Sequence, residues 1–356
     1  MRPPAFDFNK RPFILFWEIT RACALTCKHC RAEAQPRPNP NELNHAESID
    51  LIDQVADLGP VMFVLTGGDP MLRKDLFELI DYSAKQRGLH TSLSPAATEL
   101  LLRTDFHALK EAGIQRISLS LDGATRESHD AFRGLTGTFD RTVRAFEMAR
   151  EAGIPVQVNT TIHKNNLHEF EAFEELMYQW QPAMWSLFLI VPTGRASIDD
   201  LPDAEELETI LERLHEIAID APFEVKTTEG HHYRRIVLQR DKHAGRMTKR
   251  APLGIRDGCG VAFVSHTGEV SPSGFLPIVA GNVRDTQLKT IYQQSELFVN
   301  LRDHDRLLGK CGLCEFKKIC GGSRARSLGV YGDIFAEDPL CPYIPKRALA
   351  AGLTGS

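Results

Sequence analysis

The chain has no cysteine between positions 30 and 259, although its 356 residues include eight. The gap excludes thiolate ligands from the middle of the chain. The cysteines therefore form two groups: Cys23, Cys27 and Cys30 first, and then Cys259, Cys311, Cys314, Cys320 and Cys341. This distribution predicts two metal-binding regions that are separated by a cysteine-free catalytic scaffold.

The sequence also lacks a long apolar run, a net positive charge and an apolar segment at its N-terminus. No apolar run reaches the roughly 20 residues that a transmembrane helix needs, so we expect no membrane partner. The net charge of -5 excludes the basic surface that non-specific nucleic-acid binding requires. MRPPAFDFNKRP lacks the apolar core of a signal peptide. We expect a cytoplasmic, reducing location, where cysteines are metal ligands more often than disulfides.

Strand-like runs alternate with amphipathic helical stretches from residue 13 to about residue 195. The predicted strands are residues 13–20, 61–68, 90–95, 116–123, 156–163 and 186–192. The helical stretches end at Gly59, Gly88, Gly113 and Gly153, which fit C-terminal caps. The alternation predicts parallel βα units in an α/β fold, either a partial barrel or an open doubly wound sheet. In both folds the chemistry gathers at the carboxyl ends of the strands.

The character of the sequence changes near residue 240. VAFVSHTGEVSPSG predicts a β-hairpin that turns at Thr267 and Gly268, and CGLCEFKKICGGSRARS is too rich in cysteine and glycine for an ordinary core element. We therefore predict a domain at 13–240, a second at 241–345 and a flexible tail at 346–356.

The stretch CALTCKHC places three cysteines within eight residues, directly after the first predicted strand. A lone cysteine is often a small buried hydrophobe, but three at this spacing indicate a metal centre. Structural zinc usually has four protein ligands. A four-iron cluster held by three thiolates instead leaves one iron open to a substrate or cofactor.

CALTCKHC resembles the CxxxCxxC motif of radical S-adenosylmethionine (SAM) enzymes. The resemblance implies a partial (β/α)6 TIM-type barrel, with a 4Fe–4S cluster bound by Cys23, Cys27 and Cys30 and with SAM chelating the open iron. In that family an electron from the cluster cleaves SAM to methionine and a 5′-deoxyadenosyl radical, which abstracts a substrate hydrogen atom. A reductant such as flavodoxin or ferredoxin is then a partner.

Polar motifs at later strand ends support the resemblance. TGGDP looks like the GGE-type motif whose backbone receives the SAM amino group, although Asp69 stands where the family usually has Glu. Arg133 resembles an arginine that pairs with the SAM carboxylate. The alternatives are a plain turn for TGGDP and a surface arginine for Arg133. The predicted SAM contacts are Gly67, Gly68, Asp69, Ser94, Ser120, Asp122, Arg133 and Asn159.

The C-terminal cysteines have the spacing CxxCxxxxxC plus a distant fourth, which indicates a four-thiolate site for zinc or an Fe–S cluster. The region resembles the SPASM extension of radical SAM enzymes, which carries auxiliary 4Fe–4S clusters. One ligand set is complete: Cys311, Cys314, Cys320 and Cys341. In the other set Cys259 is present, but Ser273 and Ser323 stand at cysteine positions. Because thiolates favour Fe–S assembly, we predict one auxiliary cluster with an electron-transfer role.

Two stretches resemble the SPASM branch that acts on tetrapyrroles in heme and d-type heme biosynthesis. CGGSRARSLGVYGDIFAEDPLC is similar to the ending of that branch, and VKTTEGHHYRRI is similar to its KxTCAPxYxR segment, with Glu229 in place of cysteine. The resemblance implies modification or decarboxylation of a tetrapyrrole side chain. Tentative substrate residues are Arg195, His231, His232, Arg234, Arg235 and Cys259. Alternatively, HHYRR forms an exposed basic helix face.

Two other functions remain open. SPASM enzymes also mature ribosomally made peptides, although only about 12 residues precede the first predicted strand and no leader-binding domain is recognisable. A non-catalytic Fe–S or zinc protein would explain the cysteines, but it would not explain SAM-type loops at successive strand ends.

Overall fold

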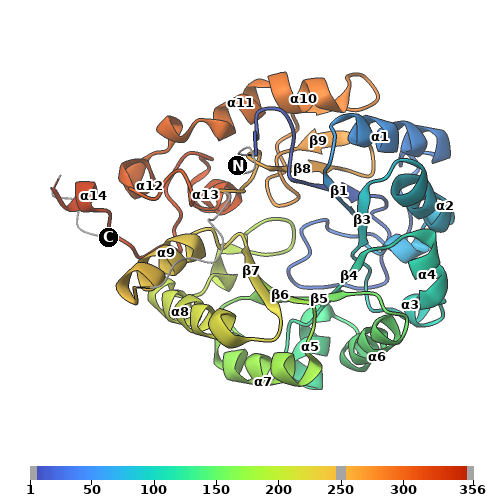
Figure 1. Cartoon of the computed structure of the whole chain (residues 1–356), viewed down its shortest axis with the longest axis horizontal. Coiled ribbons are helices and arrows are strands. Elements are labelled where there is room, and N and C mark those ends of the chain that lie inside the picture. The colour runs from blue at the N-terminus through green and yellow to red at the C-terminus, as the bar shows by residue number, and fades with distance from the viewer. Residues whose placement is uncertain (1–5, 246–253, 351–356) are drawn as a thin grey trace.

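The computed structural model describes residues 6–245 and 254–350, and its core is a parallel sheet that curves into an incomplete barrel (Figure 1). Within the described residues ten strands form one sheet, in the order β10-β9-β8-β1-β2-β3-β4-β5-β6-β7. The barrel strands are β1 (Ile14–Glu18), β2 (Met62–Thr66), β3 (His90–Leu93), β4 (Arg116–Ser120), β5 (Val156–Ile162), β6 (Met184–Leu189) and β7 (Glu224–Thr228). Each pairs in parallel with the next.

Helices surround this sheet on the outside (Figure 1). Those of the barrel are α1 (His45–Asp57), α2 (Leu76–Asp81), α3 (Glu99–Leu102), α4 (Phe106–Ala112), α5 (Arg126–Arg133), α6 (Thr138–Glu151), α7 (Phe170–Trp180), α8 (Ala204–Asp220) and α9 (Tyr233–His243). The later helices are α10 (Leu288–Gln294), α11 (Glu296–Arg302), α12 (Gly309–Leu313), α13 (Arg324–Tyr331) and α14 (Lys346–Ala350). Among the described residues no helix is both long and apolar enough to cross a membrane.

The six predicted barrel strands and the four glycine caps are confirmed. Gly59, Gly88, Gly113 and Gly153 all have left-handed φ angles, between 66° and 116°. The strands are apolar because both sheet faces are covered, and Trp17 of β1 is fully buried against Phe63 of β2. Strand β7 was not predicted. Its sequence EVKTT is polar and none of its residues is fully buried, so it carries no apolar run.

The predicted hairpin after residue 240 is confirmed as β8 (Val261–Val264) and β9 (Glu269–Ser271), followed by β10 (Gly281–Asn282). Strand β8 also pairs in parallel with β1, so this region extends the barrel sheet along its β1 edge. Of the predicted tail, residues 346–350 form α14, and residues 351–356 lie outside the described residues. Part of the polar stretch near the predicted boundary, residues 246–253, also lies outside them.

Candidate active site

The loop that follows β1 buries the thiols of Cys23 and Cys27, and leaves that of Cys30 partly exposed. Cys23 and Cys27 are each 8% exposed. The Cys23 sulfur accepts the Leu25 N–H at 3.3 Å, and the Cys30 sulfur accepts the Ala34 N–H at 3.5 Å. Burial raises the pKa of Cys23 to about 11, which disfavours a free thiolate. A bound metal cluster would reverse that preference, and the N–H groups already point at sulfur, so the loop fits a cluster.

Glu18, the last residue of β1, anchors this loop. Its fully buried carboxylate accepts from Arg31 at 3.1 Å and from Arg21 at 3.4 Å, and lies 2.9 Å from Nδ1 of His266. Burial alone raises the Glu18 pKa, but the His266 hydrogen bond and the two arginine charges outweigh it, so the pKa is lowered. Sequence reasoning missed this residue. A carboxylate that closes the apolar run ILFW, with arginines soon after, was the available signal.

The TGGDP turn after β2 lies against the backbone of the cysteine loop. Gly68 N–H donates to the Thr20 carbonyl at 2.8 Å, and Asp69 N–H donates to the Ala22 carbonyl at 2.7 Å. A Cβ on Gly68 would lie 2.4 Å from the Ala22 oxygen, which explains the glycine. The Asp69 carboxylate is buried and accepts the Thr98 hydroxyl at 2.9 Å. The two glycines therefore let the backbone of the TGGDP turn pack directly against the backbone of the cysteine loop.

We expect Gly68→Ala to displace the cysteine loop and lower its capacity to retain iron, because the clash is with backbone atoms. The expected loss of stability is about 1–3 kcal/mol, the usual range for overpacking. Iron content and thermal unfolding of anaerobically purified protein measure both effects. Gly88→Ala is the control for backbone strain without a clash, because Gly88 has a left-handed φ of 66°, which Gly68 does not, and a Cβ there meets no atom within 4 Å. Equal iron loss in both variants would contradict the clash argument.

Two predicted SAM contacts, Asp122 and Arg133, form a buried ion pair. Arg133 Nη1 lies 3.2 Å from Asp122 Oδ2, and the Arg133 side chain is only 11% exposed, so the surface-arginine alternative is wrong. Burial opposes the charge on Asp122, but Arg133 and then His29 outweigh it and lower its pKa. Burial likewise opposes the charge on Arg133, but Cys27 and Asp122 raise its pKa. The guanidinium therefore lies within electrostatic range of the thiols.

Three stacked rings form one wall beside this pair, a feature that sequence reasoning did not foresee. Phe132 lies between His29 and His163, with ring centroids 4.5 Å and 4.2 Å apart and nearly parallel planes. His29 belongs to the cysteine loop, and its Nε2 is 4.0 Å from Asp122. The stack therefore ties the cysteine loop to α5 and to the end of β5.

The remaining predicted SAM contacts lie at or near the carboxyl ends of β3 to β5. Ser94 follows β3 and donates its N–H to the Leu65 carbonyl at 2.9 Å. Ser120 ends β4 and is in register with Asn159 of β5. The Asn159 side chain accepts from Gln157 at 2.7 Å.

The turn after β6 also packs on the cysteine loop. Arg195 N–H donates to the Cys30 carbonyl at 3.1 Å, and Nη2 of the same residue lies 3.5 Å from the Ala34 carbonyl. A Cβ on Gly194 would lie 2.4 Å from the Cys30 oxygen. The loops that follow the carboxyl ends of β1 and β6 are therefore in contact. This contact puts Arg195 beside the predicted ligands of the SAM-binding cluster.

The four C-terminal cysteines line one small cavity, together with Arg235, Asp338 and Tyr343. The Cys311 sulfur accepts the Asp338 N–H at 3.4 Å, and the Cys314 sulfur accepts the Phe316 N–H at 3.4 Å. Burial raises the pKa of Cys320 to about 12, so this site too needs a cation to hold thiolates. The structure thus brings together Cys311, Cys314, Cys320 and Cys341, as the spacing predicted.

The sulfurs of the two cysteine groups are less closely packed than the ligands of a bound zinc ion would be. Zinc holds thiolates at about 2.3 Å in a tetrahedron, which puts the sulfurs roughly 3.8 Å apart. Among the described residues, only Glu229, His231 and Asp257 form a group of three or more potential ligand atoms within 4.8 Å of one another. Neither cysteine group is packed as closely as zinc requires.

The tentative substrate residues of HHYRR lie inside the protein. His231 is 5% exposed and His232 is fully buried, so the exposed-helix alternative is wrong. Arg234 donates to the carbonyls of Ile319 and Ile255. The guanidinium of Arg235 pairs with Glu208 at 2.6 Å. Both arginines therefore already have partners within the chain.

Arg235 and Cys259 have further contacts in the interior. The Arg235 guanidinium lies 4.7 Å from the ring centroid of Tyr343, beside the C-terminal cysteines. Cys259 is 4% exposed, and its N–H donates to the Arg256 carbonyl at 2.9 Å.

Comparison with known proteins places these sites in a family. The radical SAM superfamily matches residues 17–177. The AdoMet-dependent heme synthase of Nitratidesulfovibrio vulgaris is 42% identical over 345 residues, covering 94% of this chain and 93% of that protein. The Fe-coproporphyrin III synthase of Methanosarcina barkeri is 32% identical, covering 97% and 90%. The solved structure of Streptococcus suis SuiB bound to S-adenosylmethionine has a TM-score of 0.73 at 16% identity, covering 93% of this chain and 77% of that one.

The chain is thus an enzyme, and it belongs to the radical SAM superfamily. Its barrel is the partial TIM-type barrel of that superfamily, and the non-catalytic alternative is wrong. The family uses SAM and a 4Fe–4S cluster to generate a 5′-deoxyadenosyl radical, and an auxiliary cluster is typical of its SPASM-type members. Within the superfamily, the chain is similar over nearly its whole length to proteins named as heme synthases.

Proposed function

We propose that this enzyme decarboxylates propionate side chains of an iron-bound tetrapyrrole. One observation carries the proposal: 42% identity to an AdoMet-dependent heme synthase across 94% of this chain and 93% of that protein. The 32% identity to an Fe-coproporphyrin III synthase supports the same substrate class. In this proposal Cys23, Cys27 and Cys30 hold the SAM-binding cluster.

When bound, the cluster supplies the electron that cleaves SAM, and the radical so formed takes one hydrogen atom from the side chain. The carboxylate then leaves as carbon dioxide, a vinyl group forms, and one electron remains to be passed on. Cys311, Cys314, Cys320 and Cys341 would hold the auxiliary cluster that receives it. Four thiolates leave no iron open for SAM, so electron transfer suits this site.

The residues of the chain would position SAM and the substrate. The predicted SAM contacts at the strand ends would bind SAM. Among them, Asp122 would hold the Arg133 guanidinium beside the cysteine loop, where it can pair with the SAM carboxylate. Arg195 is the best placed of the tentative substrate residues, because its backbone contacts Cys30 and its guanidinium suits a propionate. We place the enzyme in the cytoplasm, a reducing compartment that suits its eight free thiols. Flavodoxin or ferredoxin is the proposed reductant, as the family resemblance implies.

Incubation with iron coproporphyrin III, SAM and dithionite under anaerobic conditions tests the substrate class. We expect a product that has lost carbon dioxide and two hydrogens per side chain, with one 5′-deoxyadenosine formed per vinyl group. Mass spectrometry and the visible spectrum report the product. SAM cleavage without any change of the tetrapyrrole, together with modification of a ribosomally made peptide, would select the peptide-maturase alternative instead.

A further inference from the structure

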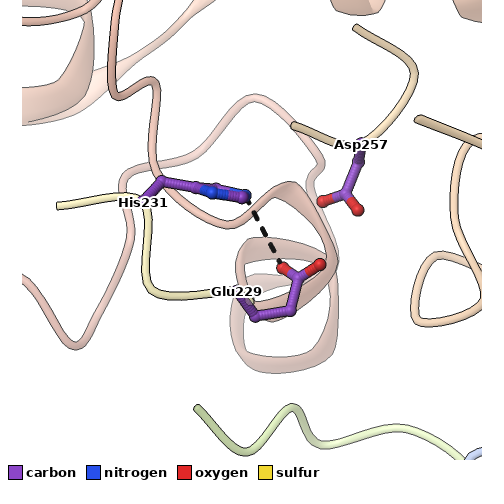
Figure 2. Close-up of side chains that lie close together, drawn as sticks. All are labelled: Glu229, His231 and Asp257. Atoms are coloured by element: carbon purple, nitrogen blue, oxygen red, sulfur yellow. Dashed lines mark ion pairs between the residues drawn. The ribbon is translucent and has the colours of Figure 1, made fainter. Parts of the chain in front are cut away.

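Three side chains outside both cysteine sites converge on one buried point. Glu229 directly follows β7, His231 comes two residues later, and Asp257 lies in the segment that leads to β8. Figure 2 shows the two carboxylates and the imidazole pointing toward one another from these separate segments. Their potential ligand atoms all lie within 4.8 Å of one another, and His231 Nε2 is 3.9 Å from Glu229 Oε2.

These groups are buried without the partners that buried polar atoms normally have. Glu229, His231 and Asp257 are 4%, 5% and 1% exposed. Within the described residues neither ring nitrogen of His231 has a hydrogen-bond partner, and Oδ1 of Asp257 has none either. An unpartnered buried polar group costs about 1–3 kcal/mol, and the cost is higher for a charged group. An unpartnered imidazole and an unpartnered carboxylate oxygen, next to the Glu229 carboxylate, therefore point to a missing ligand.

Three guanidinium groups lie within electrostatic range of this space, those of Arg234, Arg256 and Arg326. Their hydrogen bonds go to backbone carbonyls, to His304 and to Asp338, not to the side chains of Glu229, His231 or Asp257. Arg326 is near, but it donates to both carboxylate oxygens of Asp338 and only to the backbone carbonyl of Glu229. The Glu229 carboxylate accepts from the hydroxyl of Ser323. Burial, followed by the charge of Asp257, raises the Glu229 pKa well above its usual value. Burial and the facing carboxylate of Asp257 thus outweigh the nearby charge of Arg326.

The sequence singles out the same place. Glu229 and Ser323 both stand where the resembling tetrapyrrole branch has cysteine, and the structure joins them by a direct hydrogen bond. The two departures are therefore neighbours in space, although 93 residues separate them in the chain. Soft sulfur donors have been replaced by oxygen donors, which suit a harder, single cation. The left-handed backbone of Glu229, with φ of 57°, is a conformation that costs energy for a residue with a side chain.

We propose that Glu229, His231 and Asp257 bind one divalent first-row cation, such as Mn²⁺, Fe²⁺ or Zn²⁺. One imidazole and two carboxylates are a suitable mixed N/O donor set for these ions, and Ser323 adds a hydroxyl at the rim. The ion would join the end of β7, the segment before β8 and the N-terminus of α13, at the junction of the barrel with the C-terminal region. A proton shared between the carboxylates would leave His231 unpartnered, which is why a metal ion fits better.

Metal titration of the intact enzyme, with both clusters present and oxidised, tests the proposal. Mn²⁺ is added and free Mn²⁺ is followed by electron paramagnetic resonance, since oxidised 4Fe–4S clusters give no signal that interferes. Zinc content after dialysis is measured in parallel. We expect one equivalent of metal per chain in the wild type, with binding at least about 100-fold weaker in Glu229→Gln and His231→Ala, the upper end of the loss seen when second-shell support is removed.

His107→Ala is the matched control, because His107 is exposed on α4 and should leave binding unchanged. If the His231 variant fails to fold, Asp257→Asn and a metal-dependent rise in the melting temperature of the wild type give independent readouts. A wild type that binds no equivalent of Mn²⁺ or Zn²⁺, or variants that bind as tightly as the wild type, would overturn the proposal in favour of a shared proton. Metal content is measured without turnover, so this outcome is separate from that of the decarboxylation assay.

Discussion

Replacing Cys27 with serine is expected to abolish 5′-deoxyadenosine formation, a loss of more than about 10³-fold, since no electron reaches SAM without the first cluster. The physical reason is the donor set. Only three thiolates are available in the β1 loop, and a hydroxyl is a poor ligand for an Fe–S cluster. Apart from Cys23 and Cys30, which are already ligands of this cluster, no cysteine occurs before position 259, so none is left in this part of the sequence to replace Cys27.

Two cysteine variants make this result specific. Iron content should fall from about eight to about four per chain in Cys27→Ser, because one four-iron cluster is lost and the auxiliary site is untouched. Cys341→Ser should lose the other four irons and still cleave SAM, whereas Cys259→Ser should retain both clusters. Retention of about eight irons with normal SAM cleavage in Cys27→Ser would remove Cys27 from the ligand set.

The sequence was most informative where periodicity and local spacing carry the signal. Six barrel strands were predictable because both faces of a parallel sheet are buried and its strands become apolar runs. The four C-terminal cysteines were predictable as a group because their spacing is local apart from Cys341. Strand β7 could not be predicted in this way, because it lies at the edge of the sheet and its sequence EVKTT has no apolar run.

The partners that charged side chains find in the folded protein were not predictable. The sequence shows which residues carry charge, but not where their side chains point. Arg234 and Arg235 were interpreted as substrate groups from their basicity, yet they bind carbonyls and Glu208 within the fold. The contact of Glu18 with His266 was not predictable, because the two residues are 248 positions apart. Arg133 is buried in an ion pair with Asp122, and the SAM contact that its motif indicates stays a prediction.

Replacing Arg326 with methionine should destabilise the enzyme by about 3–5 kcal/mol, the cost of leaving a buried carboxylate unpaired. Arg326 and Asp338 are both fully buried, with 0% exposure. The guanidinium lies 2.9 Å and 3.1 Å from the two Asp338 oxygens. It also donates to the carbonyl of Ile190, after β6, at 3.1 Å. It therefore links α13 to the barrel.

A fall in melting temperature of roughly 4–7 °C is the expected measurement, given the usual relation between stability and midpoint for chains of this size. Arg213→Met is the matched control, because Arg213 pairs with Glu174 at 2.7 Å but is half exposed, and such pairs contribute about 1 kcal/mol or less. The double variant Arg326→Met with Asp338→Leu should recover part of the loss, since it removes the orphaned charge. Equal effects of the Arg326 and Arg213 changes would contradict the argument.

The same substitution should also weaken the auxiliary site. Asp338 holds the Ser323 N–H at 2.9 Å through its carboxylate, while its own N–H donates to the Cys311 sulfur at 3.4 Å. Removing Arg326 frees Asp338 to turn, and that turn would withdraw a hydrogen bond from one cluster ligand. We therefore expect Arg326→Met to lose up to about four irons per chain while SAM cleavage persists. Arg213→Met, which removes a half-exposed ion pair elsewhere, should keep all of its iron.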